Sequence, residues 1–498
     1  MIIRRIFHLF VLSFSLIACA STASQVPSPT NSAPPAPTAL PFATATSVTT
    51  IPSPTATNPA PAAIDPGSSV IQISYSGYSA LSNSILSLID PATGQTLPAS
   101  QTFSGTMDAI TAIPGRLAAV QGTGEVCEPM AYGTSCRSQA NLLHLVDLRN
   151  MHEITTTLPA QGWVEHAAFS PDGTHLALAD NQKQGSTLLF FNGENGSLLS
   201  SQPLPIRPTL IAFRHGGNQL VLYGQSPGTD PGVGQPPDPH VLLLDLPDLK
   251  IAWDHELTSV LSGYWCQVEC NGHIEQSSFA IWNPVVVLAP DGSALFIAHA
   301  EQDSLTRVDL QTRQVTTTNI QTASSWLDQL LSLSPQVAYA KGNQNGTSLQ
   351  GVLSPDGSRL YLLAVNFHST QGADGNWKTD FSYSGLKVID VKTGRILNRM
   401  DTHATEVQIS PDGNLLFMMN WDSPQPETEI VNTDELQIVK KLVGWEVTLT
   451  RRLDGSPIVM ATKFDNSSRQ EVSALDPQNL SIGSTWKTGN FIQFVTYK

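Results

Sequence analysis

The chain has 498 residues and a formal net charge of −15, and hydrophobic residues make up 41% of it. A polyanion of this size is a poor ligand for nucleic acid or for anionic lipid head groups, so we expect no nucleic-acid partner. Charged residues make up only 13%, about half of the usual share. Ser, Thr, Gln, Asn, Gly and Pro take their place, as in exported proteins rich in β-strands and turns.

The first 18 residues predict a secretory signal peptide. Arg4 and Arg5 precede an apolar stretch at 6–17, which is too short to span a bilayer. It ends in LIAC (16–19), which resembles the bacterial lipobox. The resemblance implies cleavage before Cys19 and acyl chains such as palmitate on that cysteine. We therefore expect a membrane-anchored lipoprotein with its globular part outside the cytoplasm, at the cell surface or in the periplasm. The alternative is an ordinary signal peptide with an incidental cysteine.

Residues 19–68 predict a lipidated cysteine followed by a disordered tether. From 20 to 68 there are eleven prolines, one acid (Asp65) and no Lys or Arg. Such a segment cannot bury enough apolar surface to offset the entropy of ordering it. Its prolines favour extended polyproline II geometry, so the tether should be semi-stiff. We expect the globular domain to occupy residues 69–498.

One turn phrase recurs along this domain. Its proline fixes the first corner of a type I turn, aspartate suits the second, and glycine takes the left-handed position that follows. The residues after it are apolar almost without alternation, which is typical of strands covered on both faces. The clear copies are FSPDGTHLALAD (169–180), LAPDGSALFIAH (288–299), LSPDGSRLYLLA (353–364) and ISPDGNLLFMMN (409–420), with looser copies at 112–120, 213–223 and 451–461.

A second phrase alternates with the first: an apolar strand, Asp or Asn, a short turn and another strand. Two hairpins per unit make a four-stranded unit, and such units stacked in a ring form a β-propeller. The pattern resembles the YVTN and WD-repeat-like propellers of bacteria over residues 69–498. We expect an all-β propeller closed by a C-terminal strand at 490–497. It should have eight blades, or seven if one weak unit is an insertion rather than a blade. The eight copies lie at 86–97, 143–154, 188–199, 241–252, 305–316, 386–397, 428–439 and 472–483.

The tight turns of both phrases should lie on one rim of the ring, because antiparallel strands alternate in direction. The long insertions near 122–140, 224–240, 256–283, 321–349 and 366–384 should then lie on the other rim. Long loops on a rigid scaffold often carry binding residues. The candidate binding residues in them are Trp265, His273, Trp282, His368, Trp377 and Tyr383.

Apart from Cys19, the chain has four cysteines in two close pairs. An even number in an exported chain favours two disulfides, Cys127–Cys136 and Cys266–Cys270. The alternative is a zinc site formed by Cys266, Cys270 and His273, but the sequence offers no fourth ligand nearby.

No catalytic motif points to a reaction. The G-x-S-x-G at 224–228 is followed by a helix-hostile segment, whereas a nucleophile elbow needs a helix there. We therefore expect no catalytic residue, no metal and no cofactor, and we favour a binding or protein-interaction module over an enzyme. Its partner would be an unknown protein or small molecule on the long-loop face, with the lipid as the only membrane contact. The alternative is a propeller enzyme, such as a lactonase-like hydrolase, or another metal-dependent site at the central channel.

Overall fold

The computed structural model describes most of the chain beyond residue 65. The described part forms β-strands and one 3₁₀ helix, η1 (Pro66–Ser68). Within it, no helix has the length and apolar character needed to cross a membrane. The described residues are 66–75, 83–105, 107–130, 133–160, 162–182, 185–227, 237–268, 278–320, 343–371, 377–421, 423, 425–464, 470–476, 479–488 and 491–495.

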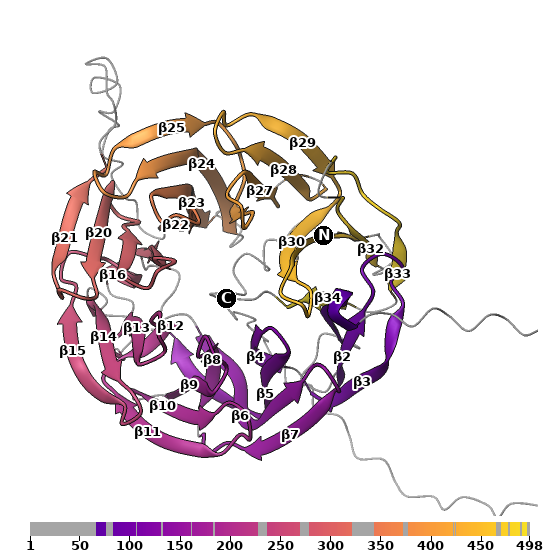
Figure 1. Cartoon of the computed structure of the whole chain (residues 1–498). Helices are drawn as coiled ribbons and strands as arrows, with labels where there is room; N and C mark the ends of the chain where they lie inside the picture. The colour runs from indigo at the N-terminus through magenta and orange to yellow at the C-terminus, as the bar shows by residue number, and fades with distance from the viewer. Residues whose placement is uncertain are drawn as a thin grey trace, which may run out of the picture.

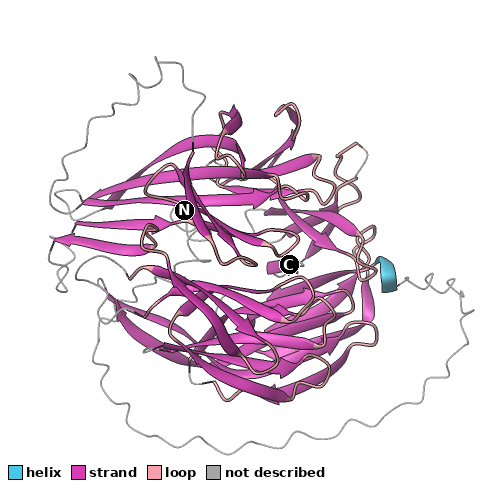
Figure 2. Ribbon diagram, turned by 60° about the vertical axis from the view of Figure 1, so that its left-hand side comes forward, coloured by secondary structure: helices cyan, strands magenta, loops and turns pink. Residues whose placement is uncertain are grey.

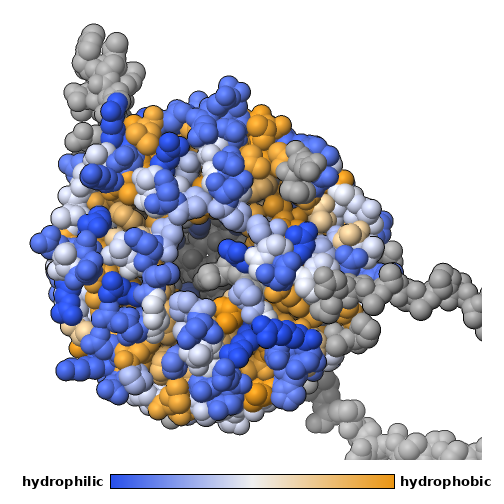
Figure 3. All heavy atoms as spheres, in the orientation of Figure 1, coloured by the Kyte–Doolittle hydropathy of each residue, from blue (hydrophilic) through white to orange (hydrophobic). Residues whose placement is uncertain are grey.

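Eight sheets, each with four antiparallel blade strands, stand in a ring around a central channel, as Figure 1 shows. This confirms the expected β-propeller and decides in favour of eight blades. In the view of Figure 3, hydrophilic side chains rim the central opening. From the inner to the outer strand, blade 1 contains β34 (Phe491–Phe494), β1 (Val70–Tyr75), β2 (Asn83–Ile89) and β3 (Thr96–Ser104); blade 2 contains β4 (Met107–Ile113), β5 (Arg116–Met130), β6 (Gly133–Asp147) and β7 (His152–Thr157).

The remaining six blades follow in chain order. Blade 3 contains β8 (Trp163–Phe169), β9 (His175–Gln182), β10 (Gly185–Asn192) and β11 (Leu198–Leu204); blade 4 contains β12 (Arg207–Phe213), β13 (Gln219–Gln225), β14 (Pro239–Asp245) and β15 (Lys250–Glu256); blade 5 contains β18 (Val285–Leu288), β19 (Ala294–Ala298), β20 (Ser304–Asp309) and β21 (Val315–Asn319). Blade 6 contains β22 (Asn343–Leu353), β23 (Arg359–Gln371), β24 (Trp377–Asp390) and β25 (Ile396–Met400); blade 7 contains β26 (Glu406–Ile409), β27 (Leu415–Asn420), β28 (Glu427–Asn432) and β29 (Ile438–Val443); blade 8 contains β30 (Glu446–Arg451), β31 (Pro457–Phe464), β32 (Gln470–Ala474) and β33 (Trp486–Thr488).

The ring closes through blade 1, which combines the two ends of the domain. Strand β34 pairs antiparallel with β1, from Gln72 opposite Phe494 to Tyr75 opposite Phe491. Ile492, Phe494 and Val495 are buried, with exposed fractions of 5%, 3% and 4%. The expected closure by the C-terminal strand is therefore confirmed.

The middle strands explain the absence of hydrophobic alternation. In β13, Leu220 and Leu222 belong to the apolar cluster shared with blade 3, whereas Val221 and Tyr223 belong to the cluster shared with blade 5. Each strand therefore buries both of its faces between neighbouring blades. Such burial contributes on the order of 2 kcal/mol per large apolar side chain.

The two ends of the ring differ in their connections. The turns from the first to the second strand of a blade, and from the third to the fourth, lie at one end, which we call the tight-turn face. The other connections lie at the opposite end, the long-connection face. Figure 2 shows η1 at the right, on the tight-turn side, and the longest strands projecting to the left.

Several insertions on the long-connection face are strands rather than loops. Strands β5 and β6 continue as a two-stranded ribbon above blade 2, and β23 and β24 extend above blade 6. Between blades 4 and 5, β16 (Gly263–Val268) and β17 (Ser278–Asn283) form a hairpin that joins the sheet of blade 6. Strand β17 pairs there with β22 in parallel.

Candidate functional site

The repeated SPDG phrase forms a self-contained turn on the tight-turn face. After β26, the Ser410 hydroxyl and the backbone amide of Asn414 both donate to Asp412. These hydrogen bonds hold the pKa of the Asp412 carboxyl below its usual range, and the bond from Ser410 makes the largest contribution. The same arrangement lowers the pKa of Asp172 and of Asp356 to about 2. The phrase therefore has a structural role.

The glycine of this turn also lies against the neighbouring blade. Gly413 has φ +77°, and a Cβ there would lie 3.0 Å from Cδ of Pro355 in the turn of blade 6. A Cβ on Gly357 would lie 3.3 Å from Cδ of Pro290 in the turn of blade 5. Glycine therefore recurs here for two reasons: it adopts the left-handed backbone conformation, and it lacks the Cβ that would press against the adjacent blade.

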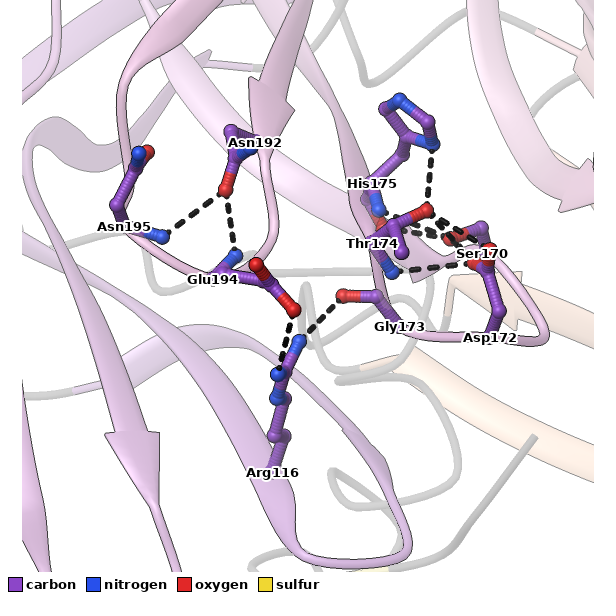
Figure 4. A network of polar contacts seen from close by, with 9 residues as sticks. All are labelled: Arg116, Ser170, Asp172, Gly173, Thr174, His175, Asn192, Glu194 and Asn195. Atoms are coloured by element: carbon purple, nitrogen blue, oxygen red, sulfur yellow. Dashed lines mark hydrogen bonds and ion pairs between the residues drawn. The ribbon is translucent and has the colours of Figure 1, made fainter.

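Side chains connect adjacent blades on the same face, as Figure 4 shows for blades 2 and 3. Arg116 donates to the carbonyl of Gly173 at 2.8 Å and forms an ion pair with Glu194 at 3.1 Å. Arg116 and Glu194 border a cavity of about 140 Å³ that Asp147 and His152 also line. A second cavity of about 340 Å³ is lined by turn and inner-strand residues of blades 5 to 8. Both cavities therefore lie at the tight-turn face.

The predicted binding residues do not converge on one site. Trp282 packs against the apolar cluster between blades 5 and 6, and its Nε1 is buried with no hydrogen-bond partner among the described residues. The Nδ1 atom of His368 contacts Oδ1 of Asn345 on β22. Tyr383 stacks on His403, with ring centroids 5.0 Å apart. The register of β23 and β24 puts His368 and Tyr383 on opposite faces of the sheet.

The other predicted residues are described less fully. Trp265 and Trp377 lie on β16 and β24, but their side chains are outside the described part of the structure, and His273 is outside it altogether. The same is true of Cys19 and Cys270. Their predicted roles therefore stay predictions.

One cysteine pair has a defined backbone position. Cys127 and Cys136 lie directly opposite each other in the ribbon formed by β5 and β6. Opposite residues of an antiparallel pair have Cβ atoms about 5 Å apart, close to the spacing in a disulfide. The register is therefore compatible with the predicted bridge.

A pair of glutamates at the channel mouth was not predicted from the sequence. Glu406 is the first residue of β26 and Glu446 the first residue of β30, so both begin inner strands of adjacent blades at the long-connection face. Both side chains are half-buried. Gln408 connects the two strands, because its Oε1 accepts a hydrogen bond from the backbone amide of Leu449 at 2.9 Å. We call Glu406 and Glu446 the carboxyl pair.

Burial gives the carboxyl pair unusual titration behaviour. Desolvation raises the pKa of Glu446 to about 8, and the negative charge of Glu406 adds to this shift. Desolvation also raises the pKa of Glu406, although a hydrogen bond from Trp421 Nε1, 3.1 Å long, opposes the shift. Strongly perturbed carboxyls in a channel mouth are candidates for binding or proton transfer.

The surroundings of the pair are aromatic and polar. Trp445 directly precedes Glu446, and the Lys463 ammonium lies 5.8 Å from the centre of its ring. The described residues contain no group of three or more His, Cys, Asp or Glu side chains that could hold a metal ion. Trp445 packs against the apolar cluster between blades 7 and 8, whereas Glu446 shares the face of Val472, which packs towards blade 1.

The sequence does contain a weak signal for the pair. A Glu-Val dipeptide begins the inner strand in two consecutive repeats, at 406–407 and 446–447. Spacing alone cannot reveal it, because the two residues lie one blade apart and only the closed ring brings their blades side by side.

Comparisons with known proteins show similarity in fold. No family model matches the chain, and no curated protein matches it. Among solved structures, it is similar to dihydro-heme d1 dehydrogenase NirN in complex with DHE, with 13% identity over 89% of this chain and 78% of that chain and a TM-score of 0.51. It also matches Kuenenia stuttgartiensis hydrazine synthase, with 13% identity over 71% and 90% of the two chains and a TM-score of 0.40. A functionally unknown protein from Desulfotomaculum acetoxidans DSM 771 matches with 9% identity over 72% and 96% and a TM-score of 0.39. At 13% identity, the likeness to NirN extends to the propeller fold alone.

Proposed function

We propose that the protein is a membrane-tethered binding module that engages a protein or small-molecule ligand outside the cytoplasm through its long-connection face. The observation that carries this proposal is where the chain enters the ring. The backbone amides of Leu453 and Asp454, in the tight turn of blade 8, donate to the carbonyls of Ser69 and Gly67 at 3.0 and 3.1 Å. Because η1 lies at the tight-turn side (Figure 2), a membrane tether arriving there would attach to the tight-turn face and leave the long-connection face free to bind.

The shape of the outward face supports this proposal. Blades 2 and 6, which carry the extended ribbons, are four blades apart in a ring of eight and so lie on opposite sides of the channel. A two-stranded ribbon is marginally stable alone. A Cys127–Cys136 disulfide would stiffen the ribbon of blade 2 and lower the entropy lost on binding.

A crosslinking experiment tests which face binds. A photo-reactive amino acid would replace Ser382, exposed on β24, and, as a matched position on the tight-turn face, Glu435, which is also exposed. In intact cells, we expect crosslinked partners from position 382 and none from 435. Crosslinks from 435 alone, or equally from both, would overturn the proposal.

The lipid anchor is tested separately. Cys19→Ala should move the protein from the membrane fraction to the soluble fraction, because it removes the acylation site. Intact-mass measurement should find acyl chains on Cys19 of the mature wild-type protein. A mature protein without acyl chains would contradict the anchor while leaving the binding face open to the crosslinking test.

The carboxyl pair favours a second candidate, a propeller enzyme with a hydrolase-type site at the channel. Two carboxyls with raised pKa can serve as general acid and base. Turnover of a lactone panel that disappears in both Glu406→Gln and Glu446→Gln would support it, and absence of turnover by the wild type on that panel would count against it.

A further inference from the structure

We propose that Tyr223, Glu301 and Ser304 hold a monovalent metal cation between blades 4 and 5, beneath the connection at 257–262. This inference goes beyond the proposed function, because the site is buried under the long-connection face and does not depend on the partner that the face binds.

Three oxygen atoms in this region are buried and have no hydrogen-bond partner among the described residues. They are the phenol oxygen of Tyr223, Oε2 of Glu301 and Oγ of Ser304. Tyr223 and Ser304 are each 2% exposed, and the side chain of Glu301 is 11% exposed. A buried polar group without a partner is unfavourable, so three of them in one region indicate a missing ligand.

The strand faces direct these groups into the same space. Tyr223 on β13 and Ile297 on β19 belong to the apolar cluster between blades 4 and 5, so Tyr223 faces blade 5 and Ile297 faces blade 4. Val308 on β20 belongs to the same cluster. Ser304 lies four residues before Val308 on that strand, so its side chain leaves the same face, towards blade 4.

His299 holds the Glu301 carboxyl on this side of blade 5. Its Nε2 lies 2.7 Å from Oγ1 of Thr306, and its Nδ1 lies 3.1 Å from Oε1 of Glu301. Thr306 is two residues from Ser304 on β20 and so shares its face. The carboxyl and the Ser304 hydroxyl therefore both lie on the surface of blade 5 that faces blade 4.

The connection at 257–262 joins this surface to blade 4. The backbone amide of Leu261 donates to Oε1 of Glu301 at 3.2 Å. The carbonyl of the next residue, Ser262, accepts a hydrogen bond from Nε2 of Gln225. Gln225 is two residues from Tyr223 on the same face of β13. One short backbone segment therefore contacts both sides of the proposed site.

The titration of Tyr223 agrees with this placement. Burial raises the pKa of the phenol, the nearby Ser262 hydroxyl opposes the rise, and the negative charge of Glu301 adds to it. Within the described structure, no hydrogen bond of normal geometry reaches the phenol oxygen. The oxygen is therefore available to a ligand that also contacts Glu301.

Charge and donor chemistry favour a monovalent metal cation. The three unpaired atoms are all oxygens, which are the ligands of hard cations. Glu301 supplies one negative charge, so a monovalent ion neutralises it, whereas a divalent ion would leave a positive charge in a buried place. A proton on His299 would also balance Glu301, but it would reach Oε1 alone and leave the three oxygens unpaired.

Stability in different chloride salts tests the site. In urea unfolding of the full-length protein in detergent, NaCl or KCl would replace tetramethylammonium chloride stepwise at constant ionic strength. The buffer is mildly alkaline, so that protons compete least for Glu301. A cation that binds only the folded state stabilises it, so each tenfold increase in free Na⁺ or K⁺ above its dissociation constant should add about 1.4 kcal/mol. Equal stability in all three salts would overturn the proposal and leave a water molecule or a proton on His299 as the occupant.

Variants locate the cation. Glu301→Gln should abolish the difference between the salts, whereas Glu194→Gln, exposed on the tight-turn face, should keep it. Tyr223→Phe should match wild-type stability in tetramethylammonium chloride, because the hydroxyl that it removes is unpaired, and should lose stability only in the salt of the bound ion. A hydroxyl with a merely structural role would lower stability equally in all salts. An undiminished difference in Glu301→Gln would place the cation elsewhere and overturn the assignment.

Calcium chloride at the same ionic strength is the divalent comparison. It should stabilise the wild type less than the alkali chlorides do. Stronger stabilisation by Ca²⁺ that disappears in Glu301→Gln would contradict the monovalent assignment. Absence of any cation effect, with crosslinks still formed from position 382, would remove this inference alone, whereas crosslinks from position 435 would contradict the proposed binding face.

Discussion

The two faces of the ring shift carboxyl pKa values in opposite directions, as the two ends of one inner strand show. Strand β26 begins with Glu406 at the long-connection face and leads into Asp412 at the tight-turn face. Hydrogen bonds lower the pKa of Asp412, whereas burial raises that of Glu406. The aspartate is satisfied by its own turn, and the glutamate is only partly satisfied by Trp421. Hydrogen bonds within the tight turn therefore lower a carboxyl pKa at one end of the strand, whereas burial raises a carboxyl pKa at the other end.

The largest expected effect comes from the closing strand, on which both faces depend. Deleting residues 490–498 removes the buried side chains of Ile492, Phe494 and Val495. At about 2 kcal/mol each, the free energy of unfolding should fall by about 6 kcal/mol. Urea denaturation measures it, with deletion of residues 20–60 as the control that should leave the midpoint unchanged. An unchanged midpoint for the C-terminal deletion would contradict ring closure by β34.

Alanine at two turn glycines tests whether the tight-turn face holds the blades together. Gly413 and Gly217 both have positive φ, +77° and +71°, so alanine at either should cost about 1 to 2 kcal/mol. A Cβ at 413 would lie 3.0 Å from Pro355, whereas at 217 the nearest atom, in Pro171, would be 3.9 Å away. Gly413→Ala should therefore lose about 1 kcal/mol more than Gly217→Ala in urea unfolding. Equal losses would mean that the contact between blades adds nothing.

The pH dependence of stability should have opposite signs at the two faces. Glu446 has a folded pKa of about 8 against an ordinary value of 4.5, so the folded state keeps a proton that the unfolded state releases between these values. Wild-type stability should fall as pH rises through that window. Glu446→Gln should be more stable than wild type by about 2 kcal/mol at pH 9 and nearly equal at pH 4.

Asp412→Asn is the matched variant for this prediction. The lowered pKa of Asp412 contributes stability above its ordinary value of 3.8 that is lost as pH falls. The variant should therefore be less stable than wild type at pH 7, and the difference should shrink in acid. Thermal unfolding across pH measures both variants. If the stability difference from wild type changed with pH in the same direction for both variants, the contrast between the two faces would be contradicted.

The smallest effect is expected at the ion pair between Arg116 and Glu194. Their side chains are 33% and 59% exposed, so solvent screens the pair. Glu194→Gln should change the free energy of unfolding by less than about 0.5 kcal/mol, and high salt should remove the difference. Arg116→Met should cost about 1 kcal/mol because it also removes the hydrogen bond to Gly173. Equal costs would mean that the ion pair, not that bond, connects blades 2 and 3.

Most of the ring could be predicted because its turns are encoded locally. Proline, aspartate and glycine in SPDG specify a turn without help from distant residues, so the copies at 169–180 and 409–420 located their hairpins. Closure by the C-terminal strand could be predicted because the domain sequence begins and ends with a strand that lacks one of its hairpin partners. The insertion at 366–384 was expected as a loop, yet it lies mostly in β23 and β24, since cross-strand pairing rather than hydrophobic pattern forms this part of the sheet.

The carboxyl pair could not be predicted in the same way. Its raised pKa values arise from burial between blades that only the closed ring brings together. Trp282 was selected for its residue type, but the structure packs it against the cluster between blades 5 and 6. Residue type indicated which side chains could bind a ligand. Whether such a side chain is accessible to a ligand depends on tertiary packing, which the sequence pattern does not give.

The parallel pairing of β17 with β22 has a consequence for the local stability of the ring. From Phe279 opposite Gln344 to Asn283 opposite Ser348, it forms the one strand ladder in the described structure that connects blade 6 to the segment leading directly into blade 5. Elsewhere, neighbouring blades meet through side chains and scattered backbone bonds. Blades 5 and 6 should therefore open together in native-state hydrogen exchange, as one cooperative unit whose amides are protected to a similar degree. The remaining blades should exchange more independently, beginning at the seam where β34 meets β1.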